Sequence, residues 1–147
     1  MTLLSADTVV CDAERVVSDG AVVVEDDRIA AVGDRDELLD AYPDHEQVTC
    51  DVLAPGLVGA HIHSVQSLGR GIADDEELLD WLFDHVLPME ASMDAAEMRA
   101  AADLGYLELV ESGTTTAIDH LSVAHADQAF EAAGDAGVRA LMGKVLM

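Results

Sequence analysis

The chain has 147 residues, half of them hydrophobic, which suits one ordinary domain or parts of two. Its 30 acidic residues against 7 Lys and Arg give a net charge of −23. This balance argues against nucleic-acid binding, which needs a basic face. No apolar run approaches the roughly 18 residues of a membrane-spanning helix, so we expect no membrane partner.

The acidic residues are dispersed along the chain, and Lys144 is the only lysine. This pattern is typical of a halophilic protein, because molar salt shortens the Debye length to about 3 Å and screens self-repulsion. A binding surface for a basic partner is the alternative. The N-terminus does not resemble a secretory signal. Cys11 and Cys50 lie far apart, as expected for reduced thiols, so we predict a cytoplasmic location.

The first 52 or so residues predict short strands and turns. Candidate strands lie at residues 3–10, 21–25, 28–32 and 48–53, with a hairpin turn at Asp26-Asp27. A short helix is predicted at residues 36–41 and is closed by Pro43. This small β unit is too short to be a complete sandwich by itself.

From Pro55 the pattern changes to alternating strand and helix. Strands are predicted at residues 57–63, 114–120 and 138–147, and helices at residues 76–86, 94–111 and 127–136. Pro88 is expected to end the first helix. Asp94 and Glu97 have the form of a capping box at the start of the second helix, which stops at Ser112-Gly113. The β-α-β-α-β order implies a parallel sheet, either open or closed into a barrel.

Two histidines, His61 and His63, end the strand that follows the Pro55-Gly56 turn. Residues i and i+2 of a strand point to the same side, so both imidazoles can bind one divalent metal ion. In a (β/α)8 barrel the C-terminal ends of the strands carry the chemistry. The bare spacing is weak evidence, because composition produces it in roughly one such chain in four or five. Ordinary core or surface histidines are the alternative.

The ordered motifs around this pair resemble the amidohydrolase superfamily. Within it they are similar to the chlorohydrolase/aminohydrolase group, which contains guanine deaminases, S-adenosylhomocysteine/methylthioadenosine deaminases and triazine hydrolases. The likeness rests on PGLVGAHIH at residues 55–63, LGRGIADD at 68–75, LDWL at 79–82, LPME at 87–90, SGTTT at 112–116, GVRA at 137–140 and GKVLM at 143–147. Gly59 departs from the group, where Asn or Asp is usual; this removes a polar neighbour of the metal but no ligand.

The resemblance implies an α/β fold. Residues 55–147 would form about three strands of an incomplete TIM-type (β/α)8 barrel, and residues 1–54 the N-terminal part of a small composite β-sandwich domain. It also implies one divalent ion on His61 and His63, zinc first and iron second. A histidine and an aspartate from later strands would complete the ligands. Metal-activated water would then replace an amino or chloro group on a purine, nucleoside or triazine-like ring.

The same resemblance places Glu90, Gln66 and Trp81 against this small heterocyclic substrate. The proton-shuttle residues are expected beyond Met147, so we expect the 147-residue chain alone to be an inactive N-terminal fragment. The alternatives are a cyclic amide hydrolase of the same superfamily and a non-catalytic remnant or partner subunit. A homo-oligomeric full-length form also stays open.

Each of these residues has a plain structural alternative: an exposed loop amide for Gln66, a surface carboxylate for Glu90, and helix packing, the preferred role, for Trp81. His120 and His125 flank the loop after the second barrel strand. An ordinary exposed or hydrogen-bonded histidine is the default there, and a role near the metal or substrate is the alternative. Lys144 is expected on the third strand, where a strand-end lysine is common.

Overall fold

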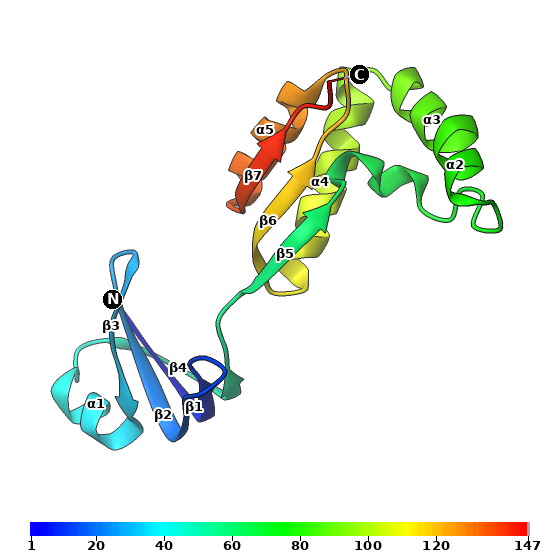
Figure 1. Ribbon diagram of the computed structural model, residues 1–147. Helices are drawn as coiled ribbons and strands as arrows, with labels where there is room; N and C mark the ends of the chain where they lie inside the picture. The colour runs from blue at the N-terminus through cyan, green and yellow to red at the C-terminus, as the bar shows by residue number, and fades with distance from the viewer. Residues whose placement is uncertain (147) are drawn as a thin grey trace. The chain divides into compact units, whose positions relative to one another are not determined.

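The computed structural model describes residues 1–146 of the chain, which divides into two compact units (Figure 1). Unit 1 spans Met1–Pro55 and unit 2 spans Gly56–Met147. Among the described residues, no helix is both long and apolar enough to cross a membrane.

Unit 1 is a four-stranded sheet with the order β3-β2-β1-β4. Its elements are β1 (Thr2–Val10), β2 (Val16–Glu25), β3 (Arg28–Asp34), α1 (Arg35–Ala41) and β4 (Glu46–Leu53). The first three strands form an antiparallel meander, whereas β4 runs parallel to β1. The predicted hairpin turn is present, and Asp26 adopts the left-handed conformation there with φ 54°. Asp34 caps α1 by accepting the backbone N–H groups of Asp36 and Glu37.

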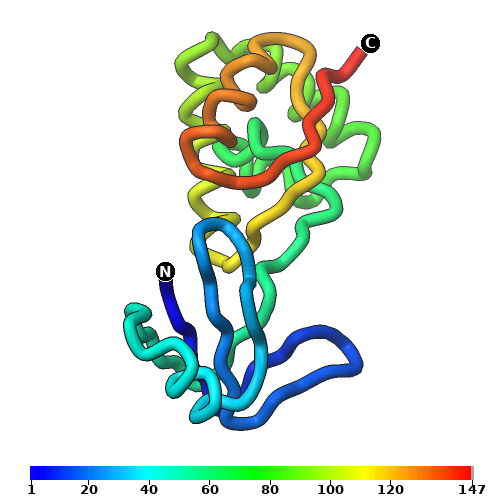
Figure 2. Tube along the Cα trace, turned by 90° about the vertical axis from the view of Figure 1, so that its left-hand side faces the viewer, coloured from blue at the N-terminus to red at the C-terminus, as the bar shows by residue number. Residues whose placement is uncertain are grey.

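Unit 2 contains a three-stranded parallel sheet with the order β5-β6-β7. The strands are β5 (Leu57–Ile62), β6 (Thr114–His120) and β7 (Arg139–Gly143), and the crossover helices are α4 (Ala95–Glu111) and α5 (Ala126–Ala136). Both helices lie on one side of the sheet (Figures 1 and 2). This is the predicted β-α-β-α-β arrangement, and the α/β fold class is confirmed.

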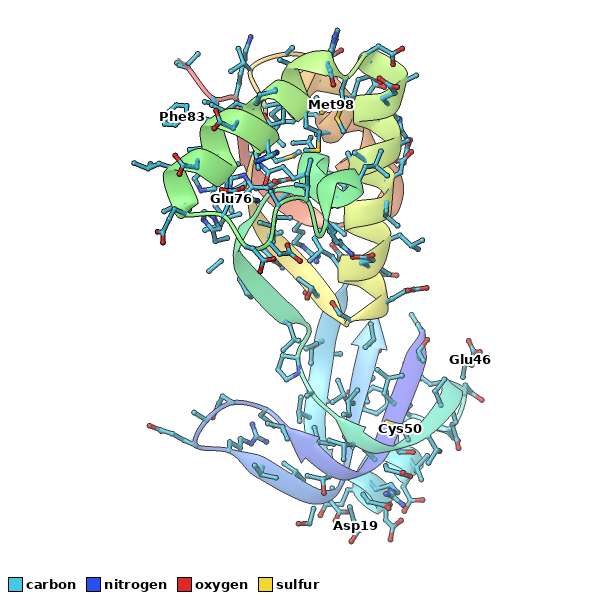
Figure 3. All side chains as sticks on the ribbon, turned by 90° about the vertical axis from the view of Figure 1, so that its right-hand side faces the viewer. Asp19, Glu46, Cys50, Glu76, Phe83 and Met98 are labelled. Atoms are coloured by element: carbon cyan, nitrogen blue, oxygen red, sulfur yellow. The ribbon has the colours of Figure 1, made fainter. Side chains whose placement is uncertain are left out.

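The core of unit 2 lies between these two helices and the sheet. Met98, Ala102 and Tyr106 of α4 are buried there together with Ala129 and Ala133 of α5. Figure 3 shows Met98 inside this layer and Phe83 on the outer side of its helix. The alanines let the helices pack closely, and the larger side chains of Met98 and Tyr106 fill the rest of this core.

The predicted helix at residues 76–86 was wrong in its extent. The helical segment consists of α2 (Leu78–Asp80), a π-helical turn η2 (Trp81–Val86) and α3 (Leu87–Ser92), so it continues through Pro88. The Leu87 N–H donates to the Leu82 carbonyl, five residues back, which is the π pattern. This wider turn directly before Pro88 accommodates a residue that lacks an N–H donor, and the proline therefore does not end the helix.

Other boundaries also differ from the prediction: β2 begins at Val16 rather than at residue 21, and β5 ends at Ile62, so His63 follows the strand instead of ending it. The third strand ends at Gly143 rather than at residue 147, so Lys144 follows β7 instead of lying on it. Met147, the last residue of the predicted strand and of the GKVLM motif, lies outside the described residues. A short 3-10 helix, η1 (Ser64–Gly69), also follows β5 directly, where no element was predicted.

Candidate metal and substrate site

The two predicted metal ligands converge at the C-terminal end of β5. The Nε2 atoms of His61 and His63 lie 3.1 Å apart. Two nitrogens on one tetrahedral zinc ion, with bonds of 2.0–2.1 Å, lie about 3.3–3.4 Å apart. The same separation suits an N–H···N hydrogen bond between two neutral rings. The pair therefore fits a shared divalent ion with little movement.

The second ring nitrogen of His63 fixes its tautomer. His63 Nδ1 lies 3.0 Å from the backbone carbonyl oxygen of His120. Because a carbonyl only accepts, Nδ1 must carry the hydrogen in this contact, which leaves a lone pair on Nε2. A ligand histidine in proteins is oriented in this way by a carbonyl or carboxylate on its other nitrogen.

His120, at the end of β6, brings a third imidazole beside the pair. Its ring centroid lies 4.8 Å from that of His61 and 5.6 Å from that of His63. Within residues 1–146, however, no group of three or more His, Cys, Asp or Glu side chains is arranged to hold a metal ion. His120 is thus a neighbour of the pair, and the described residues offer two ligands. His125 stands at the start of α5 with φ 52°.

Gln66 and Glu90 contact each other. Gln66 Nε2 donates to Glu90 Oε1 at 2.7 Å, so α3 holds the amide of a residue on η1. Gln66, His63 and Trp81 line one cavity of about 520 Å³, within the usual range for small-molecule sites. Glu90 instead borders a second cavity of about 210 Å³, next to Ser122. His63, Gln66 and Trp81 therefore share one cavity. Glu90 lines the other cavity and is linked to the first through its hydrogen bond to Gln66.

The wall of the larger cavity also carries an exposed ion pair. Arg70 of the loop after η1 contacts Glu108 of α4. The guanidinium hydrogen bond lowers the pKa of the Glu108 carboxyl. This pair ties the loop to the helix beside the cavity.

A buried carboxylate stands behind the histidines. Asp119 of β6, 2% exposed, accepts hydrogen bonds from Ser64 N at 3.1 Å and Ser64 Oγ at 2.5 Å, and from Tyr106 Oη at 2.6 Å. Burial raises the pKa of the Tyr106 phenol, and its hydrogen bond to Asp119 adds to the effect. Asp119 was not predicted as a site residue. The available signal was a single carboxylate in a strand rich in β-branched residues, directly before a histidine at the strand end.

Gly59, the departure from the group pattern, is not imposed by crowding. A Cβ atom there would meet Ile62 Cγ2 and Thr114 Cγ2 at 3.6 Å, which is ordinary van der Waals contact. The site therefore has room for a Cβ atom, and close packing does not require glycine at residue 59.

Comparisons with known proteins agree with this architecture. The amidohydrolase family model matches residues 52–147, and the imidazolonepropionase-like composite domain of bacteria matches residues 20–44. The 5-methylthioadenosine/S-adenosylhomocysteine deaminase of Nitratidesulfovibrio vulgaris strain DP4 is 36% identical over 151 residues, which covers 99% of this chain and 33% of the relative.

Two solved structures share the fold. E. coli guanine deaminase superposes with a TM-score of 0.85 at 26% identity, covering 100% of this chain and 38% of that one. An adenosine deaminase from Xanthomonas campestris with bound zinc gives a TM-score of 0.78 at 32% identity, covering 95% and 33%. The chain thus spans about a third of the length of the relatives that it matches. It belongs to the amidohydrolase family, and its unit 2 has the fold of a section of the family's α/β barrel.

Proposed function

We propose that this polypeptide supplies two metal ligands and part of the substrate pocket of a hydrolytic deaminase. The substrate class is a purine nucleoside or a related heterocycle with a ring amino group. The observation that carries the proposal is the 3.1 Å approach of the His61 and His63 Nε2 atoms at the end of a parallel barrel strand. The name of the 36% identical relative, a 5-methylthioadenosine/S-adenosylhomocysteine deaminase, supports the reaction type.

Zinc is the metal that we expect first, with iron second, since imidazole nitrogens suit both. When bound, such an ion activates water for attack on a ring carbon. His61 and His63 would hold it through Nε2. The His120 carbonyl keeps the His63 hydrogen on Nδ1, away from the metal side. The bound zinc in the adenosine deaminase of similar fold supports this assignment.

Gln66, Glu90 and Trp81 are the proposed substrate contacts. Gln66 gives an amide hydrogen to Glu90, which leaves its carbonyl oxygen free to accept from a ring N–H or amino group. The Trp81 indole lines the same cavity as Gln66 and His63 and offers an aromatic face to a heterocycle. A cytoplasmic location, a halophilic host and a homo-oligomeric full-length protein remain predictions.

Metal binding is the first test of the proposal. Titration of the 147-residue chain with Co²⁺, followed by its visible absorption, should show one site with nitrogen ligands. His61→Ala and His63→Ala should each abolish that spectrum, whereas His125→Ala serves as the matched histidine control. An unchanged titration in the His61 and His63 variants would contradict the assignment.

The reaction is tested by exchange of segments. The matching N-terminal third of the Nitratidesulfovibrio vulgaris deaminase is replaced by this chain, and the zinc content and activity of the chimera are measured. Deamination of 5-methylthioadenosine is expected, and His63→Ala in the chimera should abolish it. A folded, zinc-loaded chimera that hydrolyses only chlorotriazines or cyclic amides would favour one of the alternative functions. We expect the 147-residue chain by itself to be inactive, because its described residues offer only two ligands.

A further inference from the structure

We infer that Asp119 is a positioning residue, which together with the His120 carbonyl holds His63 in its metal-binding orientation. The inference rests on the proposed function, since it assigns the support of one proposed ligand. Two consecutive residues at the end of β6 supply both contacts. The Asp119 side chain accepts hydrogen bonds from Ser64, and the His120 carbonyl accepts one from the His63 ring.

His63 needs such support because the sheet does not hold it. β5 ends at Ile62, which pairs with Asp119, and the β5–β6 register is irregular between Gly59 and Ile62. His63 itself is the residue before η1, with φ −134° and ψ 79°. Outside a regular ladder, its orientation depends on the groups that fix its ring and the following peptide.

Asp119 fixes that following peptide. Its Oδ1 accepts from the Ser64 N–H, which belongs to the peptide unit joining His63 to Ser64. Its Oδ2 accepts from the Ser64 hydroxyl and from the Tyr106 hydroxyl. A buried carboxylate is costly unless it is hydrogen-bonded, and bonds to an ionised acceptor are about twice as strong as neutral ones. The three donors therefore hold Asp119 and Ser64 firmly together.

Helix α4 also contacts both Ser64 and Asp119. Gly105 allows the backbone of Ser64 to approach, since a Cβ atom at residue 105 would lie 3.0 Å from Ser64 Cα. The next residue, Tyr106, donates to Asp119. Two consecutive residues of α4 thus position η1 and the carboxylate together. Asp119 is not counted as a ligand here, because the described residues contain no group of three or more His, Cys, Asp or Glu side chains arranged to hold a metal ion.

The test compares Asp119→Asn, Asp119→Leu and a control, Thr114→Val, which removes a buried hydroxyl at the other end of β6. The first readout is the tautomer of His63 in the metal-free chain, from ¹⁵N multiple-bond correlation spectra at a pH where the ring is neutral. The native chain should show the Nδ1–H form. Asp119→Asn should show a mixture of the Nδ1–H and Nε2–H forms of His63. In Asp119→Leu the His63 ring should be mainly mobile.

The second readout is the dissociation constant for Co²⁺. Asp119→Leu should weaken binding by about 10–100-fold, as is usual for the loss of a group that orients a ligand. Asp119→Asn keeps one carbonyl oxygen for Ser64 N–H and should recover most of that loss, whereas Thr114→Val should leave the constant unchanged. A residue with only a structural role would lower stability but not shift the tautomer.

The outcomes separate this inference from the proposed function. If no chain binds Co²⁺ but Asp119→Asn mixes the His63 tautomers, the metal assignment fails and the positioning role stands. If the native chain binds Co²⁺ while folded Asp119→Asn leaves the His63 tautomer unchanged, the positioning role is overturned. Should Asp119→Leu not fold, the near-isosteric asparagine variant decides.

Discussion

The contact between α4 and η1 leaves no room for a methyl group at Gly105. A Cβ atom there would lie 2.7 Å from Ser67 Oγ and 3.0 Å from both Cα and O of Ser64. The Ser67 hydroxyl can turn away only by giving up its 2.8 Å hydrogen bond to the Ser64 carbonyl. The Ser64 atoms are backbone, so Gly105→Ala must push η1 away from α4.

The expected magnitude follows from three opposing effects. Overpacking of this kind costs about 1–3 kcal/mol, and a lost hydrogen bond about 0.5–1.5 kcal/mol. The better helix propensity of alanine returns about 1 kcal/mol. We therefore expect Gly105→Ala to lower the free energy of unfolding of unit 2 by about 0.5–3.5 kcal/mol. Gly134 of α5 is the matched control, because nothing lies within 4 Å of its Cβ position. Gly134→Ala should stabilise by about 0.5–1 kcal/mol.

Urea unfolding of unit 2 can be followed by the fluorescence of Trp81, the one tryptophan of the chain, and by far-UV circular dichroism. The two variants should shift the midpoint in opposite directions. A Gly105→Ala protein as stable as the Gly134→Ala protein would refute the close approach of η1 to α4, and with it the placement of Ser64 that the positioning role of Asp119 requires.

Two further predictions concern the same unit. Burial and the bond to Asp119 raise the pKa of Tyr106 in the folded state, so its contribution to stability is present below the unfolded value of about 10 and is lost as the pH rises above it. Unfolding titrations should show this alkaline loss in the native chain and not in Tyr106→Phe; equal losses in both would be contrary evidence. Asp94 caps α4 by accepting the N–H groups of Ala96 and Glu97, so Asp94→Ala should cost about 1 kcal/mol in urea unfolding while Asp94→Ser costs little. An equal loss in the serine variant would argue against a capping role.

Local signals in the sequence were enough to predict most of the helices and strands. The capping box of Asp94 and Glu97 placed the start of α4, because it needs only residues one turn apart. The turn at Asp26-Asp27 joined β2 and β3 for the same reason. Alternating strands and helices implied parallel pairing, which a crossover connection enforces. The spacing of His61 and His63 indicated that the two rings could meet, although His63 lies just past the end of β5.

Contacts between distant residues were decided by the tertiary structure alone. The sequence separation is 57 residues for the His63–His120 bond, 55 for Ser64–Asp119 and 24 for Gln66–Glu90. Only the packing of η1 between β6, α3 and α4 brings these groups together. The sequence rule that proline ends a helix also failed at Pro88, because the π turn before it accommodates a residue without an N–H donor. The sequence by itself thus determined the strand–helix order and the paired histidines, because both depend on neighbours along the chain. The folded chain decided what orients those histidines, because hydrogen bonds to a buried carboxylate and a strand-end carbonyl form only once the sheet and its helices have packed.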